Sequence, residues 1–512
     1  MYSVLKSFGL QGLNGFSVAV EADVAGGMPA LSIVGLPDSA VRESGDRVRA
    51  AARNLGFRWP DRRITINLAP ADVRKTGPVY DLPLLLAVLC AAGQLEQPPA
   101  DTAFLGELAL DGALRPVSGV LPMALTAAES GIRALYVPAD NAAEAAEAAG
   151  PRMTVYPART AREVVDALRG RAALEPARPI PFDPSDSWRS VPDFADVCGH
   201  PLARRAMVIA AAGGHNALLI GAPGTGKSML AKRLPGILPP LTREEAVETT
   251  KVYSIAGQLP QGHGLITARP FRSPHHSASA AALSGGGASF RPGECSLANC
   301  GVLFLDELPE FARESLEVLR QPLEDGQITV SRAAGSATYP SRFQLIAAMN
   351  PCKCGYFGHP TRPCTCSPSA VRQYRSRVSG PLLDRIDLCV EMDPVAFDQL
   401  HSAAPSEDSA ALRRQVLAAR AVQARRYKAP GFENVHCNAQ LSAAQVRRVC
   451  RMTPSAEALL RSSYDALGLS ARAHDRLLRV ARTIADLAGK SLLDEEALLE
   501  ALQYRAQEKV EV

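Results

Sequence analysis

The sequence lacks a segment that is long and apolar enough to span a membrane. A spanning helix needs roughly 20 consecutive apolar residues, whereas the apolar run at 84–92 is short and the run at 206–222 contains His215 and Asn216. Residues 1–15 also lack the basic end and the cleavage site of a signal peptide. We therefore expect a cytoplasmic protein that makes no contact with a membrane.

The sequence also lacks a disulfide framework and an internal repeat. Its 11 cysteines are spread over 512 residues, unlike the dense cysteine pattern of small secreted domains, and no segment recurs at a fixed period. In a reducing compartment, a tight group of cysteines is more typical of metal binding or catalysis. The composition, with 47% apolar and 21% charged residues, is that of a globular protein, and the length predicts several domains.

Charge is nearly balanced overall but is concentrated in one place. The net charge is +4 at pH 7, whereas residues 42–75 alone hold nine basic and four acidic residues. An arginine-rich segment is often simply the solvated face of a helix. Clustered arginines also bind polyanions such as nucleic acid, so the sequence leaves both interpretations open at this point.

Residues 1–171 have the mixed pattern of a small α/β domain. Short alternating apolar runs predict strands, and apolar residues at helical spacing predict helices. Prolines recur across the next segment and resist both helix and sheet, so we expect a linker at 172–192. Within the α/β domain we expect strands inside 17–36 and at 64–68, and helices at 39–54, 81–90 and 142–149.

The rest of the chain divides near residue 395. Between 193 and 395, the apolar runs 217–220 and 302–305 are short and bounded by glycines or acidic residues, as buried parallel strands are. From 396 to 512 the sequence is rich in Ala, Leu and Arg at helical spacing, most clearly at 410–427 and 472–488. The sequence therefore predicts an α/β core followed by a helical domain.

A phosphate-binding loop lies within the predicted core, between the strand at 217–220 and a helix that begins near Met229. Backbone N–H groups of such a loop hold phosphate oxygens, the lysine neutralises the terminal phosphates and the serine binds Mg²⁺. A simple Gly/Pro turn is the alternative, but the strand and the helix are both in their required places. The sequence thus predicts an ATP site with Mg²⁺. The pattern G-x-x-x-x-G-K-S is matched by Gly221, Ala222, Pro223, Gly224, Thr225, Gly226, Lys227 and Ser228.

A second strand supplies the acidic half of such a site. The apolar run 302–305 ends at Asp306 and Glu307. Asp306 is expected to join Ser228 in holding Mg²⁺, and Glu307 is expected to polarise the attacking water as a general base. Alone, an acidic pair after a strand is more often a helix cap. Together with the phosphate loop, it indicates hydrolysis of ATP.

These motifs resemble the AAA+ ATPases and, within them, the magnesium-chelatase-like branch. The resemblance implies further catalytic residues. Asn350, after the strand expected at 344–349, is similar to the sensor that contacts the γ-phosphate. Arg385, within Leu-Leu-Asp-Arg-Ile-Asp, is similar to a finger that reaches into the site of a neighbouring subunit. Arg472 is similar to a second sensor, carried by a helical lid.

A long insert lies between the phosphate loop and the acidic pair, and it resembles the helix-2 insertion of that branch. It contains His275 and His276, but neighbours in sequence point apart on a strand or helix, so we expect no metal there. Farther on, residues 323–330 predict a β-hairpin with Asp325-Gly326 at its tip. Hairpins of related motors line a pore, so Arg332 is a candidate contact for DNA phosphate.

The N-terminal domain resembles Lon-type proteases. Residues 75–81 resemble an active-site loop in which a serine nucleophile follows Gly-Pro, but that position here is Val79. The position that aligns with the partner lysine is Met123. Neither side chain supports serine–lysine chemistry, so we expect no peptidase activity. The scaffold would instead bind DNA, with candidate contacts Arg62, Arg63, Arg74 and Lys75.

Four cysteines follow Asn350 closely. Cys352 and Cys354 form one pair, and Cys364 and Cys366 form a second pair after nine intervening residues. Four thiolates close a tetrahedral site, and structural Zn²⁺ is its commonest occupant. The C-x-C spacing is tighter than the usual spacing of zinc ligands, so disulfides and free thiols stay open as alternatives.

Over essentially its whole length the chain resembles the ComM family of magnesium-chelatase-like ATPases. The resemblance implies a homo-hexameric, ATP-dependent DNA motor, a branch-migration helicase that acts with recombination proteins in homologous recombination during natural transformation. The alternative is a motor subunit that assists metal insertion into a porphyrin. The expected fold is multidomain α/β, with an AAA+ core between a Lon-like N-terminal domain and a helical C-terminal lid.

Overall fold

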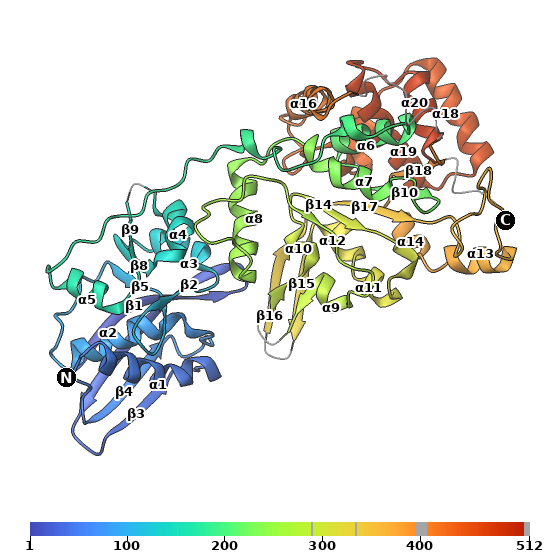
Figure 1. Cartoon of the computed structure of the whole chain (residues 1–512). Helices are drawn as coiled ribbons and strands as arrows, with labels where there is room; N and C mark the ends of the chain where they lie inside the picture. The colour runs from blue at the N-terminus through green and yellow to red at the C-terminus, as the bar shows by residue number, and fades with distance from the viewer. Residues whose placement is uncertain (151, 288–289, 333–334, 396–406, 506–512) are drawn as a thin grey trace.

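The computed structural model describes residues 1–150, 152–287, 290–332, 335–395 and 407–505. Figure 1 shows an N-terminal α/β unit, coloured blue to cyan, on one side, and a second α/β unit with the red C-terminal helices on the other. Helix α8 (Arg243–Ala256) lies between the two units. None of the helices in these ranges combines the length and the apolar character that crossing a lipid bilayer requires.

A seven-stranded mixed sheet forms the N-terminal unit, in the order β3-β4-β2-β1-β5-β8-β9. Strand β2 pairs antiparallel with β1 and β4, whereas the other neighbours pair parallel. The strands predicted inside 17–36 and at 64–68 are confirmed. The bounds are β1 (Tyr2–Gln11), β2 (Asn14–Ala25), β3 (Ala30–Val34), β4 (Arg63–Ala69), β5 (Thr102–Phe104), β8 (Ala134–Pro138) and β9 (Thr154–Ala158), with a separate pair β6 (Glu107–Leu108) and β7 (Leu114–Arg115).

The predicted helices of this unit are also present. In α1, Asp38 caps the first turn by accepting a hydrogen bond from the Val41 backbone N–H at 2.8 Å. Residues 82–89 of α2 are all buried, which explains their uninterrupted apolar sequence. The helices are α1 (Ser39–Asn54), α2 (Asp81–Ala91), α3 (Val120–Glu129), α4 (Ala142–Ala149) and α5 (Ala161–Leu168).

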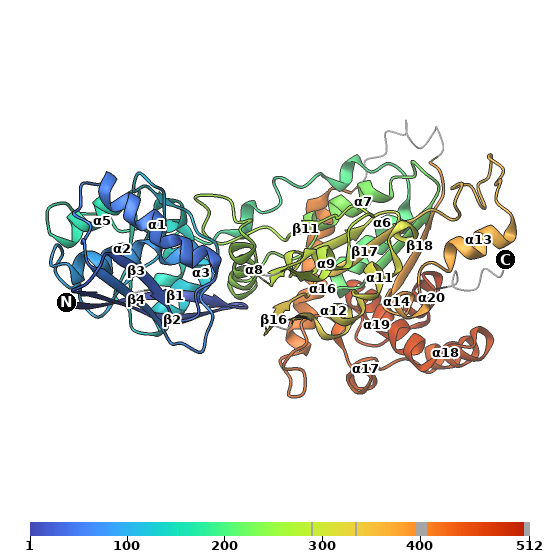
Figure 2. The same cartoon turned by 90° about the horizontal axis from the view of Figure 1, so that it is seen from below.

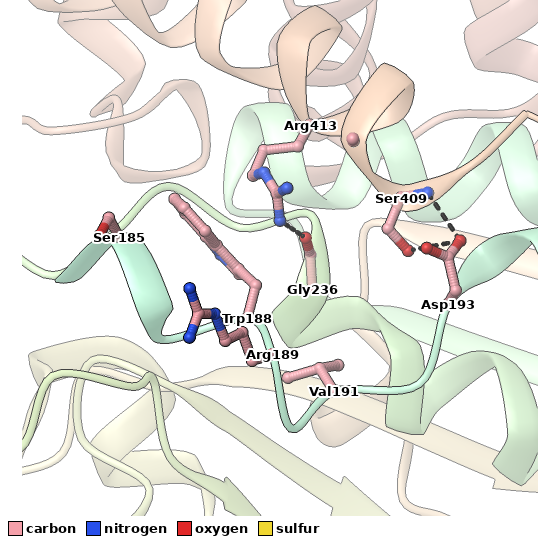
Figure 3. Close-up of a pocket in the computed structure, with 9 residues that line it drawn as sticks. Ser185, Trp188, Arg189, Val191, Asp193, Gly236, Ser409 and Arg413 are labelled. Atoms are coloured by element: carbon pink, nitrogen blue, oxygen red, sulfur yellow. Dashed lines mark hydrogen bonds between the residues drawn. The ribbon is translucent and has the colours of Figure 1, made fainter.

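The proline-rich segment runs without helix or strand over 173–183, and its end is fixed to the rest of the molecule. The Arg413 guanidinium lies 3.9 Å from the centre of the Trp188 ring and donates to the Gly236 carbonyl oxygen at 2.8 Å. The Asp193 carboxylate accepts a hydrogen bond from Ser409 N at 2.8 Å. Figure 3 shows these side chains around a cavity of about 230 Å³. The segment therefore contacts both the core and the first C-terminal helix.

The core contains a five-stranded parallel sheet of order β11-β14-β17-β10-β18. Strands β14 and β17 are buried along their whole length, as expected for a parallel sheet covered on both faces. Because all the strands point the same way, their carboxyl ends meet at one edge, where ligands of such sheets bind. The bounds are β10 (Ala217–Gly221), β11 (Phe271–Arg272), β14 (Val302–Leu305), β17 (Gln344–Met349) and β18 (Leu388–Met392).

Two short hairpins accompany this sheet, and one of them differs from its prediction. The predicted hairpin at 323–330 is wrong. Residues up to Asp325 belong to α12, and Gly326, at φ 64°, ends that helix in the left-handed conformation. A glycine after an aspartate suits a helix end as well as a turn, so the pattern was ambiguous. The hairpins are β12 (Gly285–Gly286) with β13 (Arg291–Pro292), and β15 (Gln327–Arg332) with β16 (Gly335–Pro340).

Helices complete the core and form the C-terminal part. The helices predicted at 410–427 and 472–488 are α16 and α19, so these two predictions are confirmed. The core helices are α6 (Pro201–Gly213), α7 (Lys227–Arg233), α9 (Ala280–Ser284), α10 (Glu294–Leu297), α11 (Arg313–Glu317), α12 (Arg320–Asp325), α13 (Pro368–Arg375) and α14 (Gly380–Leu383). The C-terminal helices are α16 (Ser409–Arg426), α17 (Ala443–Val449), α18 (Pro454–Leu467), α19 (Ala471–Leu487) and α20 (Glu495–Gln503).

Within the described residues, contacts between the N-terminal unit and the core include those at α8 and at the β15–β16 hairpin. On α8, the Ser254 hydroxyl donates to the buried Glu144 carboxylate at 2.6 Å, and the Ser254 carbonyl oxygen accepts from Gly119 N at 2.9 Å. At the second place, Leu13 in the β1–β2 turn packs against the buried side chains of the β15–β16 hairpin. Figure 2 shows the end of this β1–β2 pair beside β16. The N-terminal unit is therefore positioned by both an insert helix and a core hairpin.

Candidate ATP site and its surroundings

The phosphate loop follows the fold that its motif predicts. Strand β10 ends at Gly221 and α7 begins at Lys227. Gly224 and Gly226 lie at φ 83° and 85°, a left-handed conformation that favours glycine. The Lys227 ammonium lies inside the loop and donates to the carbonyl oxygens of Gly221 at 2.6 Å and Ala222 at 2.9 Å. Burial lowers its pKa, while the charges of Asp306 and Glu307 act in the opposite direction.

The two predicted Mg²⁺ ligands are in contact. The Ser228 hydroxyl, in the first turn of α7, donates to Asp306 Oδ2 at 2.6 Å. Asp306 directly follows β14, so the contact joins the end of this strand to the helix α7 that follows the phosphate loop. A hydroxyl and a carboxylate are hard oxygen ligands of the kind that Mg²⁺ prefers, and Mg²⁺ takes few protein ligands because it keeps water and phosphate oxygens. These residues therefore fit Mg²⁺ bound together with a nucleotide.

Glu307 has an unusual backbone and a partner that the sequence did not indicate. Its φ is 52°, a left-handed conformation that costs free energy for a residue other than glycine and is often found at functional sites. Its Oε2 lies 3.1 Å from His276 Nδ1, and its side chain is 52% exposed. The His275 ring lies beside the His276 ring, with centres 4.1 Å apart. The insert thus brings the His276 imidazole into contact with Glu307, the predicted general base.

The predicted sensor lies beside the phosphate loop. Asn350 directly follows β17, and its Oδ1 accepts a hydrogen bond from Lys227 Nζ at 3.2 Å. The structure therefore brings together, at the carboxyl ends of β10, β14 and β17, the side chains that would bind phosphate, hold Mg²⁺ and orient water. These side chains are Lys227, Ser228, Asp306, Glu307 and Asn350.

Arg385 and Arg472 lie near each other, and the partners of Arg385 are outside the phosphate loop. The Arg385 guanidinium pairs with Glu324 of α12 and is only 12% exposed. Burial, followed by the positive charges of Arg320 and Arg472, lowers the pKa of Arg385. Arg472 itself is exposed, in the first turn of α19. The C-terminal helices thus bring a second arginine to the face that carries the predicted finger.

The backbone around Arg385 is held from two sides. Arg476 of α19 donates to the carbonyl oxygens of Leu383 at 3.1 Å and Ile386 at 2.8 Å. On the other side, the Asn216 side chain donates to the Arg385 carbonyl oxygen at 2.8 Å. Since Asn216 immediately precedes β10, the finger segment is tied both to the C-terminal helices and to the strand that leads into the phosphate loop.

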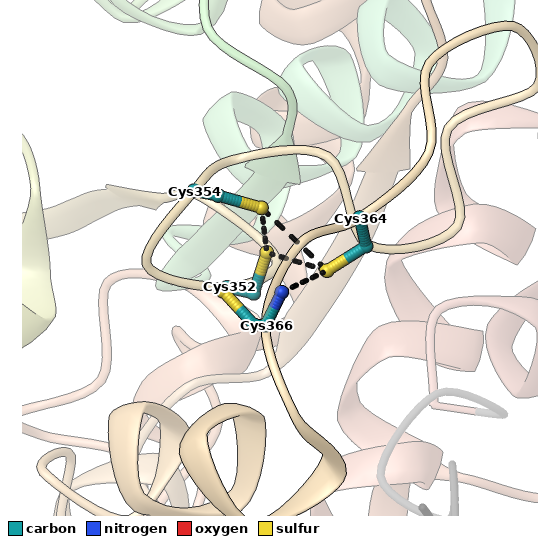
Figure 4. A group of neighbouring side chains, drawn as sticks. All are labelled: Cys352, Cys354, Cys364 and Cys366. Carbon is teal, nitrogen blue, oxygen red and sulfur yellow. Dashed lines mark hydrogen bonds between the residues drawn. The ribbon is translucent and has the colours of Figure 1, made fainter.

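The four cysteines come together as predicted from their spacing. The sulfur of Cys352 lies 3.3 Å from that of Cys354 and 3.6 Å from that of Cys364, and Cys354 and Cys364 are 3.5 Å apart. All four sulfurs, including that of Cys366, lie within 4.8 Å of one another (Figure 4). Zinc bonded to four sulfurs at 2.3 Å would separate them by about 3.8 Å, whereas a disulfide needs about 2.05 Å. The geometry fits a tetrahedral metal and no disulfide.

The environment of one cysteine also suits a metal thiolate. The Tyr356 backbone N–H donates a hydrogen bond that has the largest effect on the pKa of Cys354. Burial acts in the opposite direction, but with a further hydrogen bond from Thr365 the pKa is lowered to about 5. The thiolate is the form of cysteine that binds metals. Since the pKa values of Cys364 and Cys366 are raised, it is the sulfur geometry that fits a structural Zn²⁺.

In the N-terminal unit, the positions of the Lon nucleophile and its lysine are apolar and buried. Val79 is 6% exposed and Met123 is 1% exposed. Their place in the core is consistent with the predicted loss of serine–lysine chemistry. The same region contains a partly buried ion pair, in which Arg47 Nε donates to the buried Asp81 Oδ2 at 2.8 Å. The loop is thus retained as a packed structure.

The predicted DNA contacts of this unit separate into two groups. Arg62, Arg63 and Arg74 are exposed. Lys75 is 0% exposed, its Nζ donates to the Pro70 carbonyl oxygen, and burial lowers its pKa. The prediction that Lys75 contacts DNA is therefore wrong, because its side chain points into the protein. The side chain of Arg332, the hairpin candidate, lies outside the described part of the structure; its backbone pairs with Gly335.

The sheet order, the phosphate loop, the acidic pair and the sensor asparagine define the core as an AAA+ P-loop ATPase. The family model described as "Magnesium chelatase, subunit ChlI" matches residues 193–400. Models of "Subunit ChlI of Mg-chelatase" and of the "Magnesium chelatase, subunit ChlI C-terminal" region match residues 20–141 and 406–505. The matches therefore extend across the N-terminal unit, the core and the C-terminal helices.

Individual relatives are similar over almost the full length. The chain is 43% identical to YifB of Escherichia coli over 507 residues, which are 98% of this chain and 97% of that protein. It is 42% identical to the competence protein ComM of Haemophilus influenzae over 511 residues, with the same coverage. The chain belongs to the ComM/YifB family of magnesium-chelatase-like AAA+ proteins.

A partial similarity reaches beyond this family. The Lon protease of Mycolicibacterium smegmatis is 29% identical over 145 residues, 27% of this chain and 18% of that protein. The predicted fold class is therefore confirmed: a multidomain α/β protein with an AAA+ core, a Lon-like N-terminal part and C-terminal helices.

Proposed function

We propose that this protein is an ATP-driven DNA motor that catalyses branch migration in homologous recombination during natural transformation. The assembled ATP site is the observation that carries the proposal, since each part needed to bind and cleave the γ-phosphate comes from the core strands. ComM of Haemophilus influenzae is by name a competence protein, which supports the same biological setting here. We propose the cytoplasm as its compartment.

The chemistry follows from the positions of the side chains. Loop N–H groups and Lys227 bind the phosphates, and Ser228 with Asp306 would hold Mg²⁺. When bound, Mg²⁺ neutralises charge on the β- and γ-phosphates. Glu307 accepts a proton from the attacking water, and Asn350, in contact with Lys227, orients the γ-phosphate or that water.

The two remaining arginines favour a ring of identical chains, which we propose to be a hexamer. Arg385 pairs with Glu324. The positive charges of Arg320 and Arg472 lie near enough to act on Arg385, so an anion bound beside these arginines would be stabilised. The phosphates of a nucleotide held by a neighbouring chain are such an anion. Arg385 would act there as the finger and Arg472 as the second sensor, so hydrolysis would depend on the neighbour.

We propose that the motor acts on branched DNA and works together with recombination proteins. The exposed Arg62, Arg63 and Arg74 would contact phosphates from the N-terminal unit, and Arg332 would contact them from the β15–β16 hairpin. A structural Zn²⁺ at the four cysteines completes the proposed cofactors, beside ATP and Mg²⁺. The sulfur geometry supports this metal.

A second candidate function is that of a motor subunit in metal insertion into a porphyrin. The observation that favours it is the match of three family models described as magnesium chelatase. The Lon-like N-terminal part and the near full-length similarity to ComM favour the DNA motor instead.

The deciding experiment is branch migration of a labelled four-way or three-way junction with ATP and Mg²⁺. We expect the wild-type protein to convert the junction and Lys227→Ala to be inactive, because it loses the ammonium that neutralises the phosphates. Lys232→Ala, which changes a lysine of the same helix α7 outside the loop motif, serves as the control. An inactive wild type whose ATPase rises with a porphyrin-binding partner would overturn the DNA function and support the second candidate.

A further inference from the structure

The loop that carries the four cysteines packs directly on the phosphate loop. Gly355, between Cys354 and the aromatic residue Tyr356, lies at φ 88°, and a Cβ built on it would be 2.6 Å from Cδ of Pro223. Ordinary Cβ contacts begin at about 3.4 Å. The cysteine loop therefore approaches the phosphate loop so closely that only glycine fits at this position.

The same loop is also continuous with the end of the sensor strand β17, and α13 holds it there. Only Pro351 separates Asn350 from Cys352. Arg375 of α13 donates from Nε to the Pro351 carbonyl oxygen at 3.1 Å, and its guanidinium lies 5.2 Å from the centre of the Phe357 ring. One side of the cysteine loop thus continues directly into the residue that contacts Lys227.

The cysteine loop and the start of the phosphate loop together enclose a cavity of about 230 Å³. The phosphate loop contributes Gly221 and Ala222, the cysteine loop contributes Phe357 and His359, and the segment directly after β18 contributes Asp393. Two sequence segments more than a hundred residues apart therefore form one wall beside the nucleotide site.

Apolar burial does little to hold this wall in place. Within 351–366, only Pro351, Cys352 and Gly355 are buried, and the other residues are partly or fully exposed. A segment with so small a core is ordered mainly by other interactions, and a metal bound by four thiolates is one that couples binding to folding. The sulfur geometry already fits such a metal.

We propose that Zn²⁺ bound by Cys352, Cys354, Cys364 and Cys366 locks residues 351–366 as a wall of the ATP site. Metal occupancy then controls nucleotide affinity and turnover through the Gly355–Pro223 contact and through Asn350. The inference deepens the proposed function, since it rests on the proposed ATP and zinc sites. It assigns the metal a role in controlling the ATPase, beyond holding the loop folded.

The first test compares metal content with nucleotide binding in the full chain. Wild-type protein and Cys90→Ser, whose cysteine lies in the N-terminal unit, are expected to contain one zinc per chain by elemental analysis. Cys364→Ser is expected to lose the zinc and to bind a fluorescent ATP analogue on the order of tenfold more weakly, about 1.4 kcal/mol. A folded wild type without zinc, or unchanged affinity in zinc-free Cys364→Ser, would overturn the proposal.

The second test keeps all four cysteines and disturbs only the contact. Gly355→Ala places a Cβ against Pro223, whereas Gly358→Ala changes a glycine of the same loop at φ 76° whose Cβ would meet nothing within 4 Å. Both variants carry the strain of a left-handed alanine, so their difference isolates the contact. We expect both to retain zinc and only Gly355→Ala to lose affinity and turnover.

The size of that loss follows from the geometry. Restoring an ordinary contact requires a shift from 2.6 Å to 3.4 Å or more, and a displacement of about 1 Å at a catalytic site costs up to ~10²-fold in rate. Equal behaviour of the two variants would contradict the proposal. Because zinc content and analogue binding need no DNA, a failure of the proposed DNA function would leave these results unaffected.

Discussion

The ATP site of the core and the Lon-like segment around Val79 in the N-terminal unit differ in the side chains that they bring together. In the core, Lys227, Asp306 and Asn350 meet within hydrogen-bonding distance of a partner at the strand ends. In the N-terminal unit, the corresponding chemistry is replaced by the buried Val79 and Met123.

The difference shows how a buried position depends on the partners available to it. A buried polar group without a partner is costly, and the apolar Val79 and Met123 fill their buried positions without one. The Arg47–Asp81 pair and the Glu144 carboxylate remain because both have partners. Glu144 also accepts a hydrogen bond from Ser254 of α8, so this carboxylate joins the N-terminal unit to the core.

The largest expected effect on the ATP site comes from removing the predicted arginine finger, Arg385. Arg385→Ala should lower ATP turnover by ~10³–10⁵-fold, the range of arginine fingers, while ATP binding is retained because the phosphate loop is untouched. Steady-state ATPase and analogue binding measure the two effects. Arg377→Ala, which removes a 53% exposed arginine paired with Glu310, should have little effect.

The proposed dependence of hydrolysis on a neighbouring chain gives that prediction a second readout. Lys227→Ala cannot bind ATP well but keeps Arg385, so mixing it with Arg385→Ala should restore part of the turnover in assembled rings. No recovery on mixing, or loss of ATP binding by Arg385→Ala alone, would assign Arg385 to the structure of its own chain.

The general base should have the next largest effect. Glu307→Gln keeps the size and removes the proton acceptor, so turnover should fall by ~10²–10⁴-fold, the usual contribution of general acid–base catalysis. Analogue affinity should be retained, since the side chain is 52% exposed and faces His276. Glu310→Gln, in the same short segment, is the control, and turnover close to that of wild type in Glu307→Gln would refute the assigned role.

The parts of the ATP site that the sequence predicted depend on local patterns. A strand followed by G-x-x-x-x-G-K-S, or by two acidic residues, fixes both the element and the side chain at its end. In a parallel sheet, such ends meet at one edge, so Ser228 and Asp306 could be placed together without knowledge of any contact, whereas Asn350 was indicated by the resemblance to the AAA+ ATPases.

The contacts that the sequence could not predict join distant segments. His276 lies 31 positions before Glu307, and nothing in the pair of histidines shows which acid it will meet. In the sequence, Gly355 is one glycine of a loop, and nothing indicates that Pro223 packs against it. Lys75 has the sequence context of an exposed basic residue, but its backbone N donates to the Leu36 carbonyl oxygen at 3.1 Å, and its side chain is buried.

The His276–Glu307 contact gives a smaller, testable effect on the core site. Even an exposed ion pair contributes only about 0–1 kcal/mol, so removing the exposed His276–Glu307 contact by His276→Ala should change turnover by no more than about fivefold. We expect the rate without DNA to rise and the stimulation by DNA to shrink, because the base would no longer be held by the insert. His275→Ala, whose Nδ1 contacts Ser277 at 2.8 Å instead, should behave as wild type. A drop as large as that of Glu307→Gln would show that His276 takes part in the chemistry itself.

The smallest expected effect concerns DNA binding by the N-terminal unit. Each phosphate contact contributes about −0.9 to the slope of log affinity against log salt concentration on duplex DNA. Arg62→Ala and Arg63→Ala, which remove exposed side chains, should each reduce the steepness of that slope by about one unit and weaken binding similarly across DNA sequences. Lys75→Met removes a charge of the same segment that is 0% exposed, so it should leave the slope unchanged. If Lys75→Met altered the slope while Arg62→Ala and Arg63→Ala did not, the exposed surface of this unit would not contact DNA. DNA would then be bound by the core alone.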